Sequence, residues 1–162
     1  MLSQAYTRGL VPQAAAHEPG DMQLEKESAP RKLLSVYRIQ VRWADLDANR
    51  HVNNVTYFTY FEQARVAWLK QTGMQTTLDG EGPVVVRTTC NYRRSIPYVD
   101  ALDVRVYAGA PGRSSFPTFY EIVDADDENL LYADGEAMMV WTNRTTGKSC
   151  PLPDAMRALL AA

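Results

Sequence analysis

Residues 37–73 read YRIQVRWADLDANRHVNNVTYFTYFEQARVAWLKQTG, and the spacing of the apolar residues changes within this stretch. In the first part apolar and polar residues alternate, which is typical of a half-buried strand. From position 53 onward the apolar residues recur at the spacing of one helix face. The residues at that spacing are Phe58, Phe61, Ala64 and Trp68, and Gly73 is placed to end the helix. So many aromatic residues on one helix predict a sheet that wraps around it.

Four more stretches alternate in the same way, and links of hairpin length join them. They are 84–92, 102–106, 116–122 and 130–142. The order is one strand, one long helix and four strands, and the short links favour antiparallel pairing. We therefore predict the α+β class, with one long central helix wrapped by a five-stranded antiparallel sheet. We also expect a bulge near Gly135 and a short helix over 153–162.

Length, charge and composition exclude several classes of protein. The chain has 162 residues and a net charge of −2, which fits one domain and gives no basic surface for nucleic acid. No apolar run is long enough to span a bilayer. Two cysteines and two histidines are too few for a disulfide scaffold or a zinc site. We expect a cytoplasmic protein without a secretory signal.

The N-terminal part of the chain differs from the rest. Residues 1–32 show no apolar period, and we expect a disordered tail there. The folded domain is expected over residues 33–162.

Residues 41–65 carry a resemblance to a known family. They contain Asp-x-Asp, a short polar turn, His-Val-Asn-Asn, a tyrosine and then Phe-Glu-x-x-Arg. This pattern closely resembles the signature of the 4-hydroxybenzoyl-CoA thioesterase-like branch of the hotdog-fold acyl-CoA thioesterases. The resemblance extends over about residues 34–153. It implies the hotdog fold, which matches the order of elements predicted from periodicity, and it implies hydrolysis of an acyl-CoA thioester.

The resemblance assigns the main chemical roles. Asp47 matches the family's catalytic carboxylate, acting as general base or as nucleophile. The backbone N–H near Asn54, at the start of the helix, would polarise the thioester carbonyl, because the first N–H groups of a helix lack internal partners. The leaving thiol has a pKa of roughly 8.5, judged by cysteine, so one carboxylate can suffice without a strong general acid.

Further candidates surround Asp47. Asn49 and His51 would orient the carboxylate or the water, as an Asn-x-His pair is suggested to do in the related plant acyl-ACP thioesterases. Asn53 suits a helix N-cap better than a ligand contact, because asparagine is favoured at that position. The substrate-binding candidates are Asn53, Asn54, Tyr57, Arg50, Arg94 and Arg113.

The arginine candidates carry different expectations. Arg94 and Arg113 would meet the phosphates of CoA, unless they lie on the solvated face of their strands. Arg50 stands where many members have glycine. It would narrow the pocket or contact an anionic group of the substrate.

Other readings of the same residues are less favoured. Asp45 is expected to form a turn, and Glu62 is expected to pair with Arg65 three residues later on the helix. A calcium loop beginning at Asp45 fails, because its sixth and twelfth positions hold Arg50 and Thr56 instead of Gly and Glu.

Cys90 is not favoured as a nucleophile partnered by His51. It shares the strand phase of Val84, Val86 and Tyr92, so we expect a small core residue.

The sequence thus predicts an acyl-CoA thioesterase that releases free acid and CoA. No cofactor and no metal are expected, because CoA is part of the substrate. An acyl-ACP thioesterase and a non-catalytic acyl-CoA-binding hotdog domain remain as alternatives. The fold resemblance also implies a homodimer or homotetramer with the site between protomers.

Overall fold

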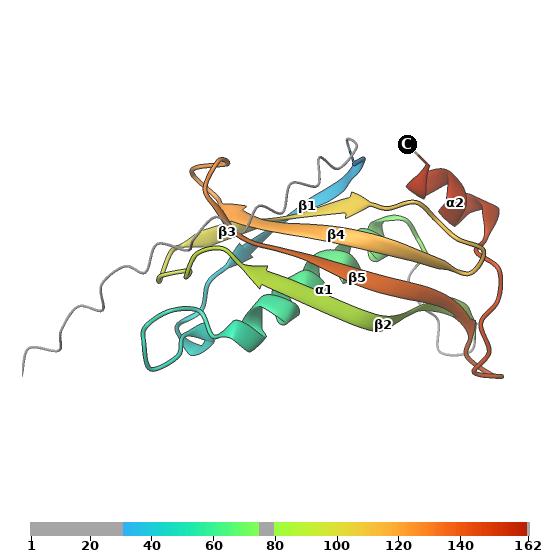
Figure 1. The fold of residues 1–162 in the computed structure, drawn as a ribbon, viewed down its shortest axis with the longest axis horizontal. Helices are drawn as coiled ribbons and strands as arrows, with labels where there is room; N and C mark the ends of the chain where they lie inside the picture. Colours follow the sequence, from blue (N-terminus) through green and yellow to red (C-terminus); the bar gives the residue numbers. More distant parts are fainter. Residues whose placement is uncertain (1–30, 75–79, 162) are drawn as a thin grey trace, which may run out of the picture.

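A computed structural model describes residues 31–74 and 80–161 (Figure 1). The predicted order of one strand, one long helix and four strands is confirmed. A single 3-10 turn, η1, follows the first strand, and a short helix ends the described chain. The elements are β1 (Leu33–Gln40), η1 (Trp43–Asp45), α1 (Asn54–Gln71), β2 (Glu81–Tyr92), β3 (Ala101–Ala108), β4 (Ser115–Asp124), β5 (Leu131–Asn143) and α2 (Asp154–Leu160).

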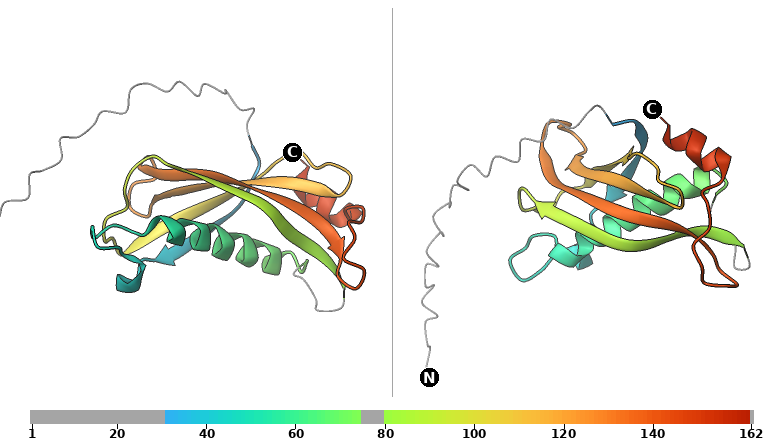
Figure 2. Two further views of the ribbon diagram at one scale, coloured as in Figure 1. Left: turned by 60° about the horizontal axis from the view of Figure 1, so that its bottom comes forward. Right: turned by 45° about the vertical axis from the view of Figure 1, so that its right-hand side comes forward.

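The five strands form one sheet in the order β1-β3-β4-β5-β2, and every neighbouring pair is antiparallel. The predicted α+β class is therefore confirmed. Strands β1 and β2 form the two edges of the sheet. α1 runs along one face of the curved sheet, and α2 lies at the opposite end from the start of α1 (Figure 2). Of the predicted tail, only residues 31 and 32 lie within the described residues.

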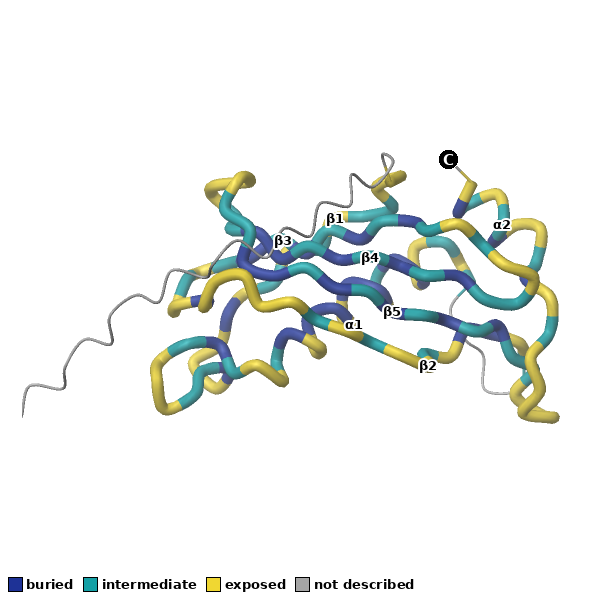
Figure 3. The backbone as a smooth tube through the Cα atoms, in the orientation of Figure 1, coloured by how far each residue is buried: buried dark blue, intermediate teal, exposed yellow. Residues whose placement is uncertain are grey.

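The core lies between α1 and the sheet. Buried and half-buried residues alternate along β3, β4 and β5 (Figure 3). From α1, Phe61 stacks on Tyr120 of β4, with ring centroids 4.7 Å apart. Asp100 O accepts a hydrogen bond from the N–H of Val41, which ties the end of β1 to the start of β3. This packing fixes the direction in which the chain leaves β1 toward α1.

The bulge expected near Gly135 lies at Tyr132 of β5, where the register with β4 shifts between Ile122 and Val123. Gly135 pairs regularly with Cys90 on β2 and with Tyr120 on β4. A Cβ at this position would lie 2.5 Å from the Thr89 carbonyl oxygen and 2.6 Å from the ring of Phe61. The glycine is needed because the helix packs so closely on β5 at this point.

A further bulge, which the sequence does not predict, lies in β2, where the register shifts between Val85 and Arg87. Val84 and Val86 are 41% and 59% exposed, and Val85 packs against the core instead. The single phase expected for β2 is therefore wrong before the bulge. The expected phase is correct after the bulge, where Cys90 packs against the core.

Two aromatic positions also differ from expectation. Trp43 lies beyond the end of β1, in η1, and points to solvent. Phe58 is at the margin of the helix face, while its neighbours Tyr57 and Tyr60 are buried. The helix end is as expected, since Gly73 adopts φ of +71° just after the last turn.

The predicted C-terminal helix forms α2, with Pro153 at its N-cap position. Among the described residues, no helix has the length and apolar character to cross a membrane.

Candidate functional site

The connection from β1 to α1 forms a closed loop that presents Asp47. An antiparallel bridge between Leu46 and Val52 closes its base. The N–H of Asp47 donates to the His51 carbonyl at 2.8 Å, and the N–H of Arg50 donates to the Asp47 carbonyl at 3.0 Å. Turn-forming residues and these short-range bonds hold the loop in one conformation. Asp47 and His51 are thus brought together, at the N-terminal end of α1.

The carboxylate of Asp47 has two different oxygens. Oδ1 accepts hydrogen bonds from the backbone N–H groups of Asn49 at 2.7 Å and His51 at 3.3 Å. Oδ2 has no hydrogen-bond partner among the described residues. One oxygen therefore fixes the orientation of the group, and the other is available for reaction. The roles expected of Asn49 and His51 in orienting Asp47 are filled by their main chains.

The first turn of α1 offers one unpaired donor. The side chain of Asn53 accepts from the N–H of Val55 at 3.0 Å, so Asn53 is the N-cap. The N–H of Thr56 donates to the Asn53 carbonyl at 2.8 Å. The N–H of Asn54 has no acceptor in the described part of the chain. It is the donor that the resemblance implies for the thioester carbonyl.

A cavity of about 320 Å³ contains both Asp47 and this helix start. Tyr57 is buried at its inner wall, where its hydroxyl accepts from the N–H of Ile96 at 3.3 Å. Tyr92 meets Tyr57 edge to face at 5.0 Å and donates its hydroxyl hydrogen to the Asn54 carbonyl at 3.0 Å. The residues lining the cavity are Asp47, His51, Val52, Asn54, Tyr57, Tyr92, Arg93, Arg94 and Ser95.

Tyr92 is the lining residue that the sequence analysis missed. It stands two residues after Cys90 in the same strand phase, which placed it on the inner face of β2. Because β2 ends beside the helix start, the last inward residue of this strand faces the site. The alternation along β2 indicates the face on which Tyr92 lies. That this face borders the site follows only from the position of the end of β2 beside α1.

The arginine candidates lie in different places. Arg94 and its neighbour Arg93 both line the cavity, and Arg93 is also paired with Asp134. Arg50 is exposed, with φ of +62°. Arg113 lies far from Asp47, in the β3–β4 connection, where its carbonyl accepts from the N–H of Leu152 near α2. The structure thus brings Arg94, but not Arg113 of the same chain, to the candidate site.

Asp45 lies near Asp47 in sequence but serves the fold. It is 3% exposed and binds the guanidinium of Arg42 at 2.7 Å and the hydroxyl of Tyr60 at 2.9 Å. Burial raises the pKa of this carboxyl, and the hydrogen bonds from Arg42 and Tyr60 outweigh burial, so the pKa is lowered overall. The expected structural role of Asp45 agrees with this geometry.

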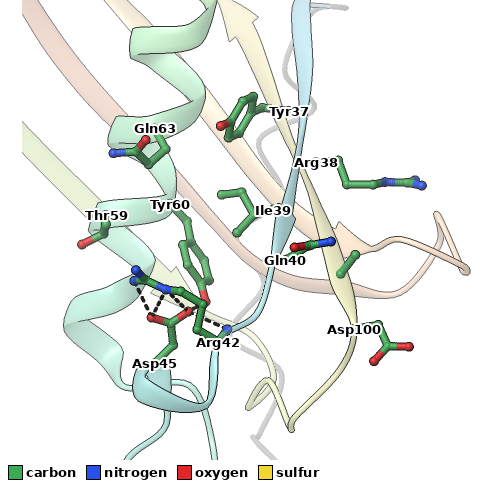
Figure 4. Close-up of a pocket in the computed structure, with 11 residues that line it drawn as sticks. Tyr37, Arg38, Ile39, Gln40, Arg42, Asp45, Thr59, Tyr60, Gln63 and Asp100 are labelled. Atoms are coloured by element: carbon green, nitrogen blue, oxygen red, sulfur yellow. Dashed lines mark hydrogen bonds and ion pairs between the residues drawn. The ribbon is translucent and has the colours of Figure 1, made fainter.

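A larger cavity of about 680 Å³ lies between α1 and β1 (Figure 4). Asp45, Arg42 and Tyr60 line one end of it, and Ile39 and Gln63 lie farther along. Asp47 and His51 are not among its lining residues. Size alone therefore does not identify the reactive site.

The remaining titratable candidates are Cys90 and Glu62. Burial raises the pKa of the Cys90 thiol to about 11, so the thiolate is scarce near neutral pH. Glu62 and Arg65 do not pair as expected, because Arg65 is buried and donates to the Tyr120 hydroxyl at 3.2 Å. No cluster of three or more His, Cys, Asp or Glu side chains suited to a metal occurs within residues 31–74 and 80–161.

A family model covers most of the chain. Residues 41–160 match the model of the thioesterase-like superfamily. This range begins at the end of β1 and includes the Asp47 loop, α1 and the rest of the sheet.

Solved structures of thioesterases are also similar to this chain. A proposed thioesterase from Pseudomonas aeruginosa is 36% identical, with a TM-score of 0.77 over 80% of this chain and 100% of the other. A proposed acyl-CoA thioesterase from Xanthomonas campestris is 37% identical, with a TM-score of 0.63 over 68% and 93%. A DHNA-CoA thioesterase from Staphylococcus aureus is 25% identical, with a TM-score of 0.65 over 73% and 80%.

Proposed function

This chain belongs to the thioesterase-like superfamily and is a thioester hydrolase, and from that premise we propose that it cleaves acyl-CoA to free acid and CoA at Asp47. The single observation that carries the site assignment is the shared cavity of Asp47 and the start of α1. Asp47, which has one carboxylate oxygen without a partner, and Asn54, whose N–H is unpaired among the described residues, both line it. Those are the two groups that thioester cleavage requires.

The N–H of Asn54 polarises the carbonyl. A developing oxyanion is stabilised by a donor that is already oriented and lacks a competing acceptor. The partial positive charge at the start of α1 adds to this effect. The hydroxyl of Tyr92, bonded to the Asn54 carbonyl, holds the same peptide segment in place.

Asp47 supplies the attacking oxygen in one of two ways. As a base, Oδ2 removes a proton from water, whose oxygen adds to the acyl carbon. As a nucleophile, Oδ2 adds to that carbon itself, and water then hydrolyses the mixed anhydride. In both routes the C–S bond breaks, the thiolate leaves and takes up a proton, and one water is consumed.

The CoA carrier is supported by the site and by the relatives. Arg94 lines the cavity beside Asp47, and a guanidinium suits a phosphate. The relatives from Xanthomonas campestris and Staphylococcus aureus are described as acting on acyl-CoA and DHNA-CoA. The proposed substrate class is acyl-CoA thioesters, with no particular acyl group assigned.

We place the chain in the hotdog fold and expect it to act as a homodimer paired along β2. This strand is an edge of the sheet, and Val84 and Val86 are exposed on it. Val55 and Val66 are exposed on α1 as well. Unpaired edge strands with apolar side chains favour pairing with another chain. A second copy along β2 would also cover the open side of the cavity, since Tyr92 and Arg93 stand at the end of that strand.

The activity is tested by measuring thiol release from short, medium, long and aromatic acyl-CoAs. The wild-type protein should turn over at least one class. Asp47→Asn keeps the size of the side chain but removes its basicity, so kcat should fall by about 10²-fold or more with little change in binding. Asp126→Asn, in the exposed β4–β5 turn, is the matched control and should behave as wild type. Equal turnover by Asp47→Asn and Asp126→Asn would overturn the assignment.

A further inference from the structure

Two large aromatic side chains lie exposed and in contact at the end of the molecule where α1 begins. Trp43 in η1 is 72% exposed, and Tyr98 in the β2–β3 connection is 56% exposed. Their ring centroids are 5.9 Å apart, and the ring planes cross at 77°. Single exposed apolar side chains are ordinary, but two exposed aromatic rings in contact are typical of binding surfaces. The chemistry at Asp47 uses neither ring.

The two rings are held in place by the segments that carry them. In η1 the N–H of Leu46 donates to the Trp43 carbonyl at 3.2 Å. The neighbouring ion pair of Arg42 with Asp45 ties the same turn to α1 through Tyr60 (Figure 4). The N–H of Val52 donates to the Ile96 carbonyl at 2.9 Å, which joins the Asp47 loop to the segment leading to Tyr98. The aromatic pair therefore does not need to be ordered by a ligand.

We propose that Trp43 and Tyr98 bind the adenine ring of coenzyme A, an inference that rests on the function proposed above. Because the planes of the two side-chain rings are nearly perpendicular, a third flat ring can stack on the face of one of them while its edge contacts the other. Base stacking on aromatic side chains is favourable for any base, because every base has a π face. In an acyl-CoA, adenine is the flat aromatic ring at the opposite end of the molecule from the thioester.

The distances along the chain allow one substrate to reach both places. Asp47 follows Trp43 by four residues, so their Cα atoms are at most about 14 Å apart. The pantetheine arm contains two amide linkages and has roughly the reach of a four-residue peptide, about 14 Å. Arg94 lines the cavity and precedes Tyr98 by four residues on the other segment. Its guanidinium is a suitable partner for the phosphates that link the two ends of CoA.

Tryptophan fluorescence tests the contact without any turnover. The chain has three tryptophans, and Trp68 and Trp141 are buried, so Trp43 is the one open to a ligand. Adenosine 3′,5′-bisphosphate, the nucleotide part of CoA, should quench wild-type fluorescence in a saturable titration. Trp43→Phe should lose this quenching but bind the nucleotide to within about threefold by calorimetry, because it keeps an aromatic face. Trp43→Ala should bind about tenfold more weakly.

Kinetics with two substrates that share one acyl group test the role in catalysis. For acyl-CoA, Trp43→Ala and Tyr98→Ala should raise KM about tenfold and leave kcat nearly unchanged. For the matching acyl-pantetheine, which has no adenine, neither variant should change kcat/KM. Tyr98→Phe keeps the ring and should lose less than Tyr98→Ala on acyl-CoA. Val36→Ala, at an exposed apolar position of β1 outside both sites, is the matched control and should have wild-type values on both substrates.

The outcomes of these experiments distinguish a failure of the adenine site from a failure of the proposed thioesterase activity. If the wild type hydrolyses acyl-CoA and acyl-pantetheine with the same KM and the nucleotide causes no quenching, the adenine site is wrong and the thioesterase stands. If neither thioester is hydrolysed but the nucleotide quenches Trp43, the adenine site stands and the proposed reaction is wrong. Equal losses of Trp43→Ala on both substrates would also overturn the adenine site, because a general structural defect would explain them.

Discussion

At the scale of single residues, the main-chain contacts of Asp47 decide how much the side chains of its neighbours should contribute to turnover. Oδ1 is bonded to the N–H groups of Asn49 and His51, which no side-chain substitution removes. We therefore expect Asn49→Ala and His51→Ala to lower kcat less than Asp47→Asn does. Steady-state kinetics on the three variants, corrected for the folded fraction, gives the ranking. A loss in His51→Ala as large as that in Asp47→Asn would make the imidazole itself a proton carrier.

Cys90 should prove dispensable for turnover. Burial raises the pKa of its thiol to about 11, so the protonated form persists through the neutral range. Cys90→Ala should retain the turnover of its folded fraction and lose about 1 kcal/mol of stability through a small cavity. Urea unfolding and thiol-release kinetics measure the two effects. A folded but inactive Cys90→Ala would point to a thiolate enzyme instead.

Arg50 should be a source of backbone strain. Its φ of +62° lies in the left-handed region, which costs an L-residue about 1–2 kcal/mol. Glycine removes this cost but gains about 0.4–1 kcal/mol of unfolded-state entropy, so Arg50→Gly should be more stable by about 0.5–1 kcal/mol. Arg50→Ala keeps the strain and is the control. If both variants unfold at the same urea concentration, the loop tolerates this φ without strain.

At the scale of elements, close packing of α1 on β5 makes Gly135 sensitive to substitution. A Cβ there would meet the carbonyl oxygen of Thr89, which cannot move without breaking the sheet, and the ring of Phe61. Gly135→Ala should therefore lose about 2–3 kcal/mol of stability. Gly112→Ala, whose Cβ would meet the Ser115 hydroxyl at 3.3 Å and the Ser115 carbonyl oxygen at 3.4 Å, should lose much less. Chemical unfolding of both variants tests this, and an equal effect would contradict it.

Periodicity predicted the elements but not the details of their contacts. The helix over 54–71 and all four later strands could be recognised, because their apolar spacing is set by the core that they share. The bulge in β2 could not, because it depends on pairing with β5 and leaves no glycine or proline at Val86. The bulge expected near Gly135 lies at Tyr132, and Gly135 itself marks the close approach of α1 to β5, the other common reason for a glycine in a strand.

The candidate site was predictable where it is local in sequence. Asp47, Asn53 and Asn54 lie in one segment of eight residues, so their proximity in the fold follows from their proximity in the sequence. Arg113 and Tyr92 depend on which strand ends meet, and that is a property of the sheet order. The sequence pattern could not separate a strand arginine near the site from one at the opposite end.

At the scale of the whole molecule, the two edges of the sheet are not equivalent. β2 has 12 residues and exposes Val84 and Val86, and its end borders the cavity. β1 has 8 residues and exposes Val36 and Arg38, and it lies away from Asp47. Both edges expose two large apolar residues, since Leu33 is exposed on β1 beside Val36, so the greater length of β2 and its position beside the cavity make it the edge that should join two copies.

A lysine on each edge in turn tests which edge pairs. Val86→Lys places a charge on the β2 edge, where it would be buried between two copies, so the dimer should dissociate to a species near 18 kDa by sedimentation. Val36→Lys puts the same charge on β1 and should leave the dimer intact. Dissociation should also lower kcat/KM, because the second copy covers the open side of the cavity. A wild-type protein that is monomeric and fully active would contradict the assembly, and a dimer broken only by Val36→Lys would move it to β1.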